Sequence, residues 1–233
     1  MAGDRHMDKT ILIVEDEFRM RELISDYLRQ EGYKVLEADN GVDALEIFEN
    51  SNVDLILLDI MMPRLDGFAV CRSIRKKDCR VFIIMLTARS EEYDKLMGYE
   101  FGADDYISKP FSLKVLIAKV NALLKRTQMD SEATGGIYEA GGIIVNEISH
   151  NVSLNGEEIE FTPKEFDLLL FLIRNKNIVL SREVILNKVW GYNYYGDLRT
   201  VDTHIKRIRQ KLKDEADMVS TIRGSGYKFE VKK

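Results

Sequence analysis

Short, almost wholly apolar runs alternate with longer amphipathic stretches along the first half of the chain. The apolar runs ILIV, YKVLEA, VDLILLD, VFIIMLT and DYI each predict a buried strand. Amphipathic residues at helical spacing follow them, at 18–31, 42–49, 68–75, 91–101 and 113–126. Near-continuous apolar strands are typical of a parallel sheet that helices cover on both faces. The five strand–helix pairs in residues 9–126 therefore predict a doubly wound α/β domain with right-handed crossovers.

The pattern changes after TQMDSEATGG, at 127–136. This polar, small-residue segment lacks apolar periodicity, which is typical of a linker. Over 137–233, short strands at 142–146, 151–154 and 158–161 precede three helical patterns, and a hairpin around Gly224, Ser225 and Gly226 closes the chain. We expect a second domain of the α+β class there.

Start signals mark the helices of this second half. Thr162, Pro163 and Glu165 supply a cap, a first-turn proline and an acidic first turn, and Ser181 caps the next helix. A third helix is predicted from Leu198 or Arg199 to Lys213. A helix, a loop and a basic helix followed by a glycine-turned hairpin form the layout of a winged helix-turn-helix domain.

The composition of the chain limits the classes of protein to which it can belong. The 233 residues carry 34 basic and 39 acidic side chains, a net charge of -5, so any contact with nucleic acid must be local. No apolar run approaches about 18 residues and no signal-peptide core is present, so we expect a soluble, cytoplasmic protein. Residues 1–8 are expected to be an N-terminal extension, in which Met1 to His6 resemble a cloning remnant before a native Met7. Cys71 and Cys79 suggest reduced thiols rather than a zinc site or a disulfide.

Acidic side chains stand where two of the predicted strands end. Glu15 and Asp16 follow the first strand, and Asp59 ends the third. Because ligands of open α/β sheets bind beyond the carboxyl ends of the strands, these groups are expected to share one crevice. Carboxylate oxygens suit Mg²⁺ or Mn²⁺, which would relieve their mutual repulsion. With such an ion present, Asp59 is a candidate nucleophile toward phosphorus, and hence a candidate phosphoacceptor.

Two further strand ends supply groups that bind a phosphoryl group. Thr87 closes VFIIMLT with a hydroxyl, and Lys109 follows DYIS with an ammonium group. The Lys109–Pro110 bond is a candidate cis peptide. Taken singly, each of these residues also has a structural interpretation, as a cap, a solvated acidic face or a surface lysine. Their joint placement at strand ends favours the functional interpretation.

Four motifs give residues 9–126 a specific resemblance to the receiver domain of bacterial two-component response regulators, which has a flavodoxin-like fold. They are VEDE, LLDIMMPRLDGF, MLTA and GADDYISKPF. The resemblance implies that Asp16 and Asp59 bind Mg²⁺ with the main-chain carbonyl of Met61, and that Glu15 supports the site. It also implies that the threonine and lysine named above hold the phosphoryl group, and that the donor is a phosphohistidine of a histidine kinase.

The same resemblance implies a switch, in which Thr87 is drawn toward the phosphoryl group and Tyr106 turns inward. From the residues alone, Tyr106 is equally consistent with an amphipathic core tyrosine. In this family the residues at the positions of Met61 and Arg89 influence how water reaches the phosphate, and their bulk here predicts a phosphoryl lifetime of minutes or longer. We therefore expect a phosphoacceptor with at most slow self-dephosphorylation, and not an enzyme.

The predicted third helix of the second half is strongly basic. Residues 199–213 contain six basic side chains and one acidic one, a local charge of +5. Four apolar residues at helical spacing are expected to face a core, namely Val201, Ile205, Ile208 and Leu212. The exposed and flanking positions are then Thr203, His204, Lys206, Arg207 and Gln210. Such a face can enter a major groove, although a solvated charged helix is the plain alternative.

Residues 137–233 resemble the effector domain of the OmpR/PhoB subfamily through FTPKEFDLLLFL, VW, RTVDTHIKRIRQKL and IRGSGYKF. The resemblance implies a regulator that binds promoter DNA when phosphorylated. The implied DNA contacts are Arg199 or Thr200, Thr203, His204, Lys206, Arg207, Arg209 and, at the hairpin tip, Arg223. A hairpin-tip arginine can reach a minor groove. In this family the loop at 190–197 often meets RNA polymerase, although a plain aromatic linker is nearly as good an interpretation.

Receivers of this subfamily form homodimers through the fourth helix, fifth strand and fifth helix. The matching charged residues here are Lys95, Asp104, Asp105, Lys119 and Arg126. Asp105 with Lys119 and Asp104 with Arg126 are the expected pairs across the two-fold axis. Val115 stands where Lys95 would find its usual acidic partner, which weakens the expectation of this dimer.

Three alternatives share parts of this pattern. A haloacid-dehalogenase-type phosphatase would need a second aspartate where Met61 stands, and a flavodoxin would need a phosphate loop where Glu15 to Glu17 stand. The strongest alternative is a constitutive DNA-binding regulator whose receiver is not controlled by phosphorylation. The intact acceptor set argues against it.

Overall fold

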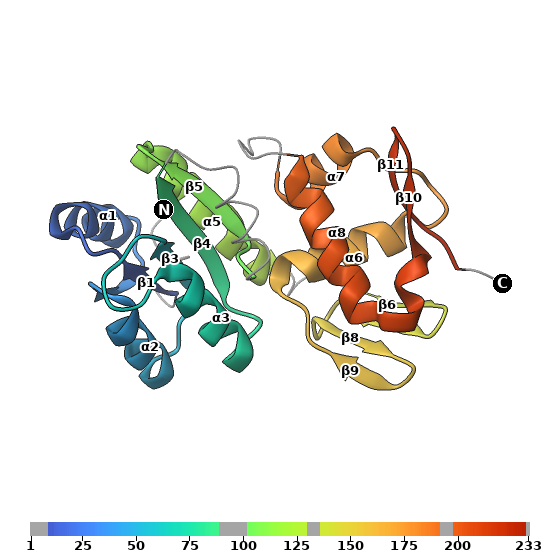
Figure 1. Cartoon of the computed structure of the whole chain (residues 1–233), viewed down its shortest axis with the longest axis horizontal. Helices are drawn as coiled ribbons and strands as arrows, with labels where there is room; N and C mark the ends of the chain where they lie inside the picture. The colour runs from blue at the N-terminus through green and yellow to red at the C-terminus, as the bar shows by residue number, and fades with distance from the viewer. Residues whose placement is uncertain (1–8, 89–101, 130–135, 192–197, 232–233) are drawn as a thin grey trace. The chain divides into compact units, whose positions relative to one another are not determined.

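The computed structural model describes residues 9–88, 102–129, 136–191 and 198–231 (Figure 1). Within these ranges, the side chains of residues 88 and 125–129 are not described. The chain divides into two compact units, Met1–Met129 and Asp130–Lys233. Among the described residues, no helix is both long enough and apolar enough to cross a membrane.

A five-stranded parallel sheet forms the centre of the first unit. Its strands are β1 (Thr10–Val14), β2 (Lys34–Ala38), β3 (Leu55–Asp59), β4 (Phe82–Ala88) and β5 (Asp105–Lys109). They lie in the order β2-β1-β3-β4-β5, and every neighbouring pair is parallel. β1, β3 and the described side chains of β4 are almost wholly buried, because helices cover both faces. The predicted doubly wound domain is confirmed.

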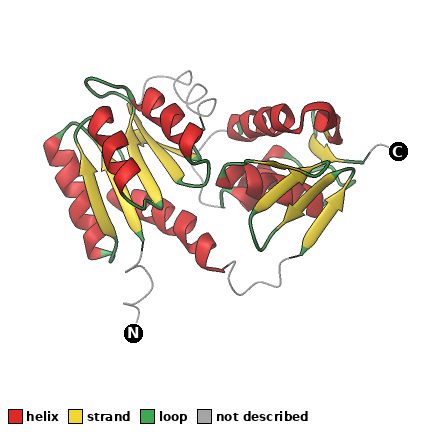
Figure 2. Cartoon of the chain, turned by 90° about the horizontal axis from the view of Figure 1, so that it is seen from below, coloured by secondary structure: helices red, strands yellow, loops and turns green. Residues whose placement is uncertain are grey.

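The helices of this unit pack on both faces of the sheet (Figure 2). They are α1 (Phe18–Gln30), α2 (Gly41–Asn50), α3 (Gly67–Lys77) and α5 (Leu113–Met129). Apolar residues of α1 and α5 pack with one face, and those of α2 and α3 with the other. The predicted helix at 91–101 lies outside the described residues. α5 continues three residues beyond its expected end at Arg126, so the first part of the predicted linker is helical.

The second unit combines an antiparallel sheet with three helices and a terminal hairpin. The sheet contains β6 (Ile137–Ala140), β7 (Ile143–Asn146), β8 (Asn151–Leu154) and β9 (Glu157–Ile159), in that order. Then come α6 (Pro163–Arg174), α7 (Arg182–Val189), α8 (Arg199–Leu212), a 3-10 helix (Lys213–Met218), β10 (Val219–Ile222) and β11 (Gly226–Phe229). β6 was not predicted, because Ala140 is its only buried residue and no alternating apolar pattern marks it.

Two predicted helix starts in this unit are confirmed by their hydrogen bonds. Thr162 and Glu165 form a reciprocal capping box at α6, in which the Thr162 main-chain N–H donates to the Glu165 carboxylate at 2.9 Å. The Ser181 hydroxyl accepts from the Val184 N–H at 3.2 Å at the start of α7. The apolar face predicted for α8 is also confirmed, because Val201, Ile205, Ile208 and Leu212 are all buried in the core of this unit.

Candidate acidic site and nucleic-acid interface

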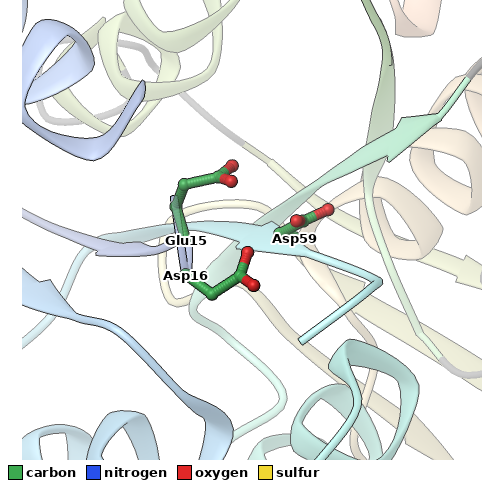
Figure 3. Close-up of side chains that lie close together, drawn as sticks. All are labelled: Glu15, Asp16 and Asp59. Atoms are coloured by element: carbon green, nitrogen blue, oxygen red, sulfur yellow. The ribbon is translucent and has the colours of Figure 1, made fainter. Parts of the chain in front are cut away.

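Three carboxylates gather at the carboxyl edge of the parallel sheet (Figure 3). Glu15 and Asp16 follow β1 and Asp59 ends β3, and these two strands are hydrogen-bonded neighbours. One oxygen from each carboxylate lies within 4.8 Å of the others. Glu15 and Asp59 are buried, whereas Asp16 is exposed. The residues predicted to share one crevice therefore do lie together.

Lys109, at the end of β5, reaches into this acidic cluster. Its Nζ donates to Glu15 Oε2 at 2.6 Å and to Asp59 Oδ2 at 3.0 Å. Burial raises the pKa of Glu15 above its ordinary value, although the bond from Lys109 opposes that effect. Burial alone would lower the pKa of Lys109, but its bonds to the two carboxylates outweigh burial and raise it. Three carboxyl groups and one ammonium group carry a formal charge of -2, which matches a divalent cation.

The loop after β3 is pressed against Asp59. The Gly67 N–H donates to the Ile60 carbonyl at 3.0 Å, and a Cβ atom at Gly67 would lie 2.2 Å from the Asp59 main-chain oxygen. Any other residue at position 67 would therefore displace this backbone. This close approach explains why the sequence LDGF has glycine at position 67. The same contact holds the main chain of Asp59 in place.

Thr87 and Tyr106 occupy neighbouring strands beside the acidic cluster. Thr87 pairs in register with Ser108, and Tyr106 pairs with Met85, two residues before Thr87. The alternation of side chains along a strand therefore puts Thr87 and Tyr106 on the same face of the sheet. Both are buried, Tyr106 to 7% exposure, whereas Met61 is 73% exposed. The Lys109–Pro110 peptide bond is cis, as predicted.

Three of the residues predicted for a dimer surface, Asp104, Asp105 and Lys119, make contacts within the chain. Asp105 accepts from Lys119 Nζ at 2.7 Å. Asp104 has no exposed surface, and it accepts from Arg75 at 2.6 Å and from the Ile83 N–H at 2.9 Å. This burial argues against the predicted surface pair of Asp104 with Arg126. Lys95 and Arg89 lie outside the described residues, as does the side chain of Arg126.

The expected DNA contacts of α8 divide into exposed and buried residues. Arg199 and Lys206 are exposed, as is Arg223 in the turn between β10 and β11. Thr200 and His204 have no exposed surface, and Thr203 retains 8%. This burial argues against Thr200 and His204 as DNA contacts, because neither side chain has surface that DNA could touch.

His204 belongs to the core of the second unit instead. Its Nδ1 lies 2.8 Å from the Thr200 carbonyl oxygen, and its ring packs edge-on against Trp190 with centroids 4.9 Å apart. Burial lowers the pKa of His204 to about 3, so the ring is neutral at pH 7. The burial of His204 could have been predicted from its spacing in the sequence. It lies three residues after Val201 and four before Ile208, within the apolar stripe of the helix.

Several of the basic residues of α8 are turned toward the protein. Arg207 and Lys211 lie 2.8 and 2.5 Å from the carboxylate of Glu165, which has no exposed surface. Arg209 donates to the Val219 carbonyl at 2.8 Å. These contacts fasten α8 to α6 and to β10. The charge of +5 therefore overstates how much positive charge the helix presents outward.

Sequence reasoning missed a polar network that fastens the hairpin to α8. Asp202 accepts from Arg182 Nε and from the Tyr227 hydroxyl, both at 2.6 Å. The Arg182 guanidinium lies 4.9 Å from the Tyr227 ring centroid, and Arg209 lies 5.7 Å from it. Arg182 begins α7, Asp202 lies in α8 and Tyr227 in β11, so no sequence spacing could have shown that they meet.

Comparison with known proteins agrees with this two-unit organisation. Residues 11–121 match the family model of the response regulator receiver domain, and residues 156–229 match that of the C-terminal domain of transcriptional regulatory proteins. The chain is 44% identical to transcriptional regulatory protein ResD of Bacillus subtilis (strain 168), over 98% of each protein. It is 43% identical to transcriptional regulatory protein SrrA of Staphylococcus aureus (strain NCTC 8325 / PS 47), over 97% of each.

Solved structures are also similar over nearly the whole chain. A mutant of RitR superposes with a TM-score of 0.78 at 26% identity, over 96% of this chain and 100% of that one. DrrB of Thermotoga maritima, an OmpR/PhoB homologue, gives a TM-score of 0.51 at 34% identity, over 95% and 99%. A receiver domain joined to a DNA-binding domain implies a histidine kinase as partner and DNA as target. The chain belongs to the OmpR/PhoB family of two-component response regulators, which are transcriptional regulators.

Proposed function

We propose that this chain is a transcriptional regulator whose DNA binding is controlled by phosphorylation of Asp59. The observation that carries the proposal is the meeting of Asp59 with Glu15, Asp16 and Lys109 at one edge of the sheet. A nucleophilic carboxylate, further oxygen ligands and a cation are the groups that phosphoryl transfer to an aspartate requires.

In the proposed reaction, a carboxylate oxygen of Asp59 attacks the phosphorus of a phosphohistidine on a histidine kinase. A P–O bond forms and the P–N bond breaks, and the histidine nitrogen keeps the electron pair and is free to take a proton. Lys109, already 3.0 Å from Asp59, binds a phosphoryl oxygen through its ammonium group. The hydroxyl of Thr87, at the end of the neighbouring strand β4, binds another.

The acidic cluster fits Mg²⁺ or Mn²⁺. Asp16 and Asp59 would hold the ion together with the main-chain carbonyl of Met61, and Glu15 would support it. These are hard oxygen donors, and the three carboxylates lie within 4.8 Å of one another. When bound, the ion supplies positive charge that offsets the charge of the carboxylates and the phosphoryl group.

Phosphorylation is proposed to act on the rest of the chain through Thr87 and Tyr106. Movement of Thr87 toward the phosphoryl group opens space on its own face of the sheet, where Tyr106 lies in the next strand. The receiver then favours a homodimer through the surface that includes Lys95, Lys119, Asp105 and Arg126. Asp105 and Lys119 already pair within one chain, so this dimer would need the pair to exchange partners.

The DNA-binding surface is proposed to consist of the exposed part of α8 and the tip of the hairpin. Its contacts are Arg199, Lys206, Arg223 and the largely buried Thr203, which retains 8% exposure. Arg207 and Arg209 would add positive potential near the groove while holding α8 in place. The loop at 190–197, which is proposed to meet RNA polymerase, lies mostly outside the described residues.

The affinity of the full chain for its promoter DNA, measured before and after treatment with a small phosphodonor and Mg²⁺, tests this function. We expect tighter binding after treatment, and no change for Asp59→Asn. The control is Asp26→Asn, which removes an exposed carboxylate from α1 and should respond as the unchanged chain does. Equal affinity of the unchanged chain before and after labelling would instead favour the alternative of constitutive DNA binding.

A further inference from the structure

Arg21 holds the loop that carries the acidic cluster. Its Nη1 donates to the main-chain carbonyl of Glu15 at 2.6 Å and lies 3.5 Å from that of Asp16. Its side chain is only 13% exposed. We propose that Arg21 is a positioning residue for divalent-cation binding, and that it acts by fixing the main chain of Glu15 and Asp16. The proposal rests on the metal site of the proposed function.

The Glu15 main chain is held on both sides. Its N–H donates to the Ala38 carbonyl at 3.1 Å, which continues the β1–β2 ladder, and its carbonyl accepts from Arg21. Its side chain is held separately by Lys109. Without Arg21, the Glu15 carbonyl would lose a charge-assisted hydrogen bond at the point where the chain leaves the sheet.

The start of α1 gives the loop little other support. Glu17 is the N-cap residue, and its side chain makes no capping hydrogen bond. Asp16 is exposed, so the position of its carboxylate depends on the main chain more than on packing. Because no cap side chain holds this loop at Glu17, Arg21 supports it from the first turn of the helix, by donating to the Glu15 carbonyl.

The orientation of Arg21 is itself fixed by its neighbours. Its Nε lies 3.6 Å from Glu37 Oε2 on β2, and its guanidinium lies 5.6 Å from the Phe18 ring centroid. Glu37 also accepts from Arg29 at 2.7 Å. The ion pair with Glu37 and the contact with Phe18 keep the guanidinium aimed at the loop.

Electrostatics and positioning predict opposite effects of removing Arg21. If Arg21 acted only through its positive charge, Arg21→Ala would tighten Mg²⁺ binding by removing repulsion. If it positions the loop, the same change weakens binding, because ligands whose outer partners are lost typically bind metal about 10- to 100-fold less tightly. Since Arg21 acts through the main chain, we expect the lower end of that range.

The test is the Mg²⁺ dissociation constant of the full chain, measured by calorimetry. Arg21→Ala and Arg21→Gln should raise it by about 10-fold, and Arg21→Lys, which keeps the charge and one donor group, by less. Arg29→Ala is the matched control: it removes the same charge and a bond to Glu37 from the same helix but leaves the loop contacts, and should stay within about two-fold. Circular dichroism in EDTA verifies that each variant is folded.

The kinetics of phosphodonor labelling give a second readout. At saturating Mg²⁺ the Arg21 variants should label at close to the rate of the unchanged chain, whereas the Mg²⁺ concentration for half-maximal rate should rise with the dissociation constant. Unchanged or tighter Mg²⁺ binding by Arg21→Ala, or equal weakening by Arg29→Ala, would overturn the role of Arg21 alone. Absence of Mg²⁺ binding by the unchanged chain would overturn the metal site of the proposed function, and the role of Arg21 with it.

Discussion

Lys109 donates a hydrogen bond of 3.0 Å to Asp59, although β4 lies between their two strands in the sheet. The long lysine side chain spans that distance and also reaches Glu15. Lys109 is therefore the counter-ion of two buried carboxylates. This arrangement predicts that the same residue stabilises the resting fold and binds the phosphoryl group.

Lys109→Met should destabilise the first unit in EDTA by about 2 kcal/mol, because hydrogen bonds to charged groups contribute about 1.5–3 kcal/mol. The variant should also gain more thermal stability from added Mg²⁺ than the unchanged chain does, since its carboxylates lack a counter-ion. Lys77→Met, which removes an exposed pair with Glu49, should cost no more than about 1 kcal/mol. Thermal unfolding with and without Mg²⁺ measures both effects, and a Lys109→Met chain as stable as its parent in EDTA would contradict the assignment.

The buried cluster of Glu165 with Arg207 and Lys211 predicts acid sensitivity of the second unit. Burial favours the neutral acid, but the two cations and their bonds outweigh burial and lower the pKa of Glu165 below its ordinary 4.5. A carboxyl group with a lowered pKa in the folded state stabilises the fold above about pH 4.5, and this contribution is lost as the pH falls through the folded-state value.

Glu165→Gln should therefore cost about 3 kcal/mol at pH 7, because it leaves two cations without their carboxylate. The difference from the unchanged chain should shrink as the pH falls below 4.5. Trp190, the single tryptophan of the sequence, reports unfolding of this unit by fluorescence. Glu183→Gln, which removes an exposed carboxylate from α7, is the control and should show no such pH dependence. A pH-independent cost of Glu165→Gln would show that its ionic contacts are not the cause.

Exposure predicts which residues of α8 meet DNA phosphates. Lys206→Ala should weaken binding to all sequences and reduce the slope of log affinity against log salt concentration by about 1, as loss of one phosphate contact does. His204→Gln replaces a buried neutral side chain and should leave that slope unchanged in the folded protein. Salt titrations of DNA binding compare the two variants. A lower slope for His204→Gln with an unchanged slope for Lys206→Ala would reverse our assignment.

Two glycines of the hairpin differ in the space around them. A Cβ atom at Gly226 would lie 2.0 Å from the Leu180 carbonyl oxygen, whereas one at Gly224 would meet nothing within 4 Å. Both have positive φ, 139° and 75°, so alanine at either position is strained by about 1–3 kcal/mol. Gly226→Ala should cost more than Gly224→Ala, because the clash adds to the strain. Denaturant unfolding followed by Trp190 fluorescence tests this order, and equal costs would refute it.

The sequence predicted the parallel sheet well because its signals are local. Apolar runs such as VDLILLD mark buried strands, and the carboxyl-end rule places Asp59, Glu15 and Lys109 at one edge. The close approach of Gly67 to Asp59 could not be predicted, because it depends on where a loop folds back after a strand. The same holds for Arg21, whose partners are main-chain carbonyls and therefore leave no mark in the sequence.

The nucleic-acid half was predicted less completely, because residue type does not show which way a charged side chain turns. His204 was assigned to the DNA surface by the family resemblance and as a position outside the four apolar residues, although its helical position puts it within the apolar stripe. Arg207 and Lys211 were counted as outward charge, but a buried glutamate on another helix binds them. β6 was not predicted, because a strand with one buried residue shows no alternating apolar pattern.

Mass analysis of the full chain after exposure to a small phosphodonor and Mg²⁺ tests the central claim most directly. We predict one added phosphoryl group, located on Asp59 by peptide mapping, in the unchanged chain and in Asp26→Asn, and none in Asp59→Asn. A phosphoryl group that persists in Asp59→Asn, or that maps to another residue in the unchanged chain, would contradict the assignment of Asp59 as the phosphoacceptor.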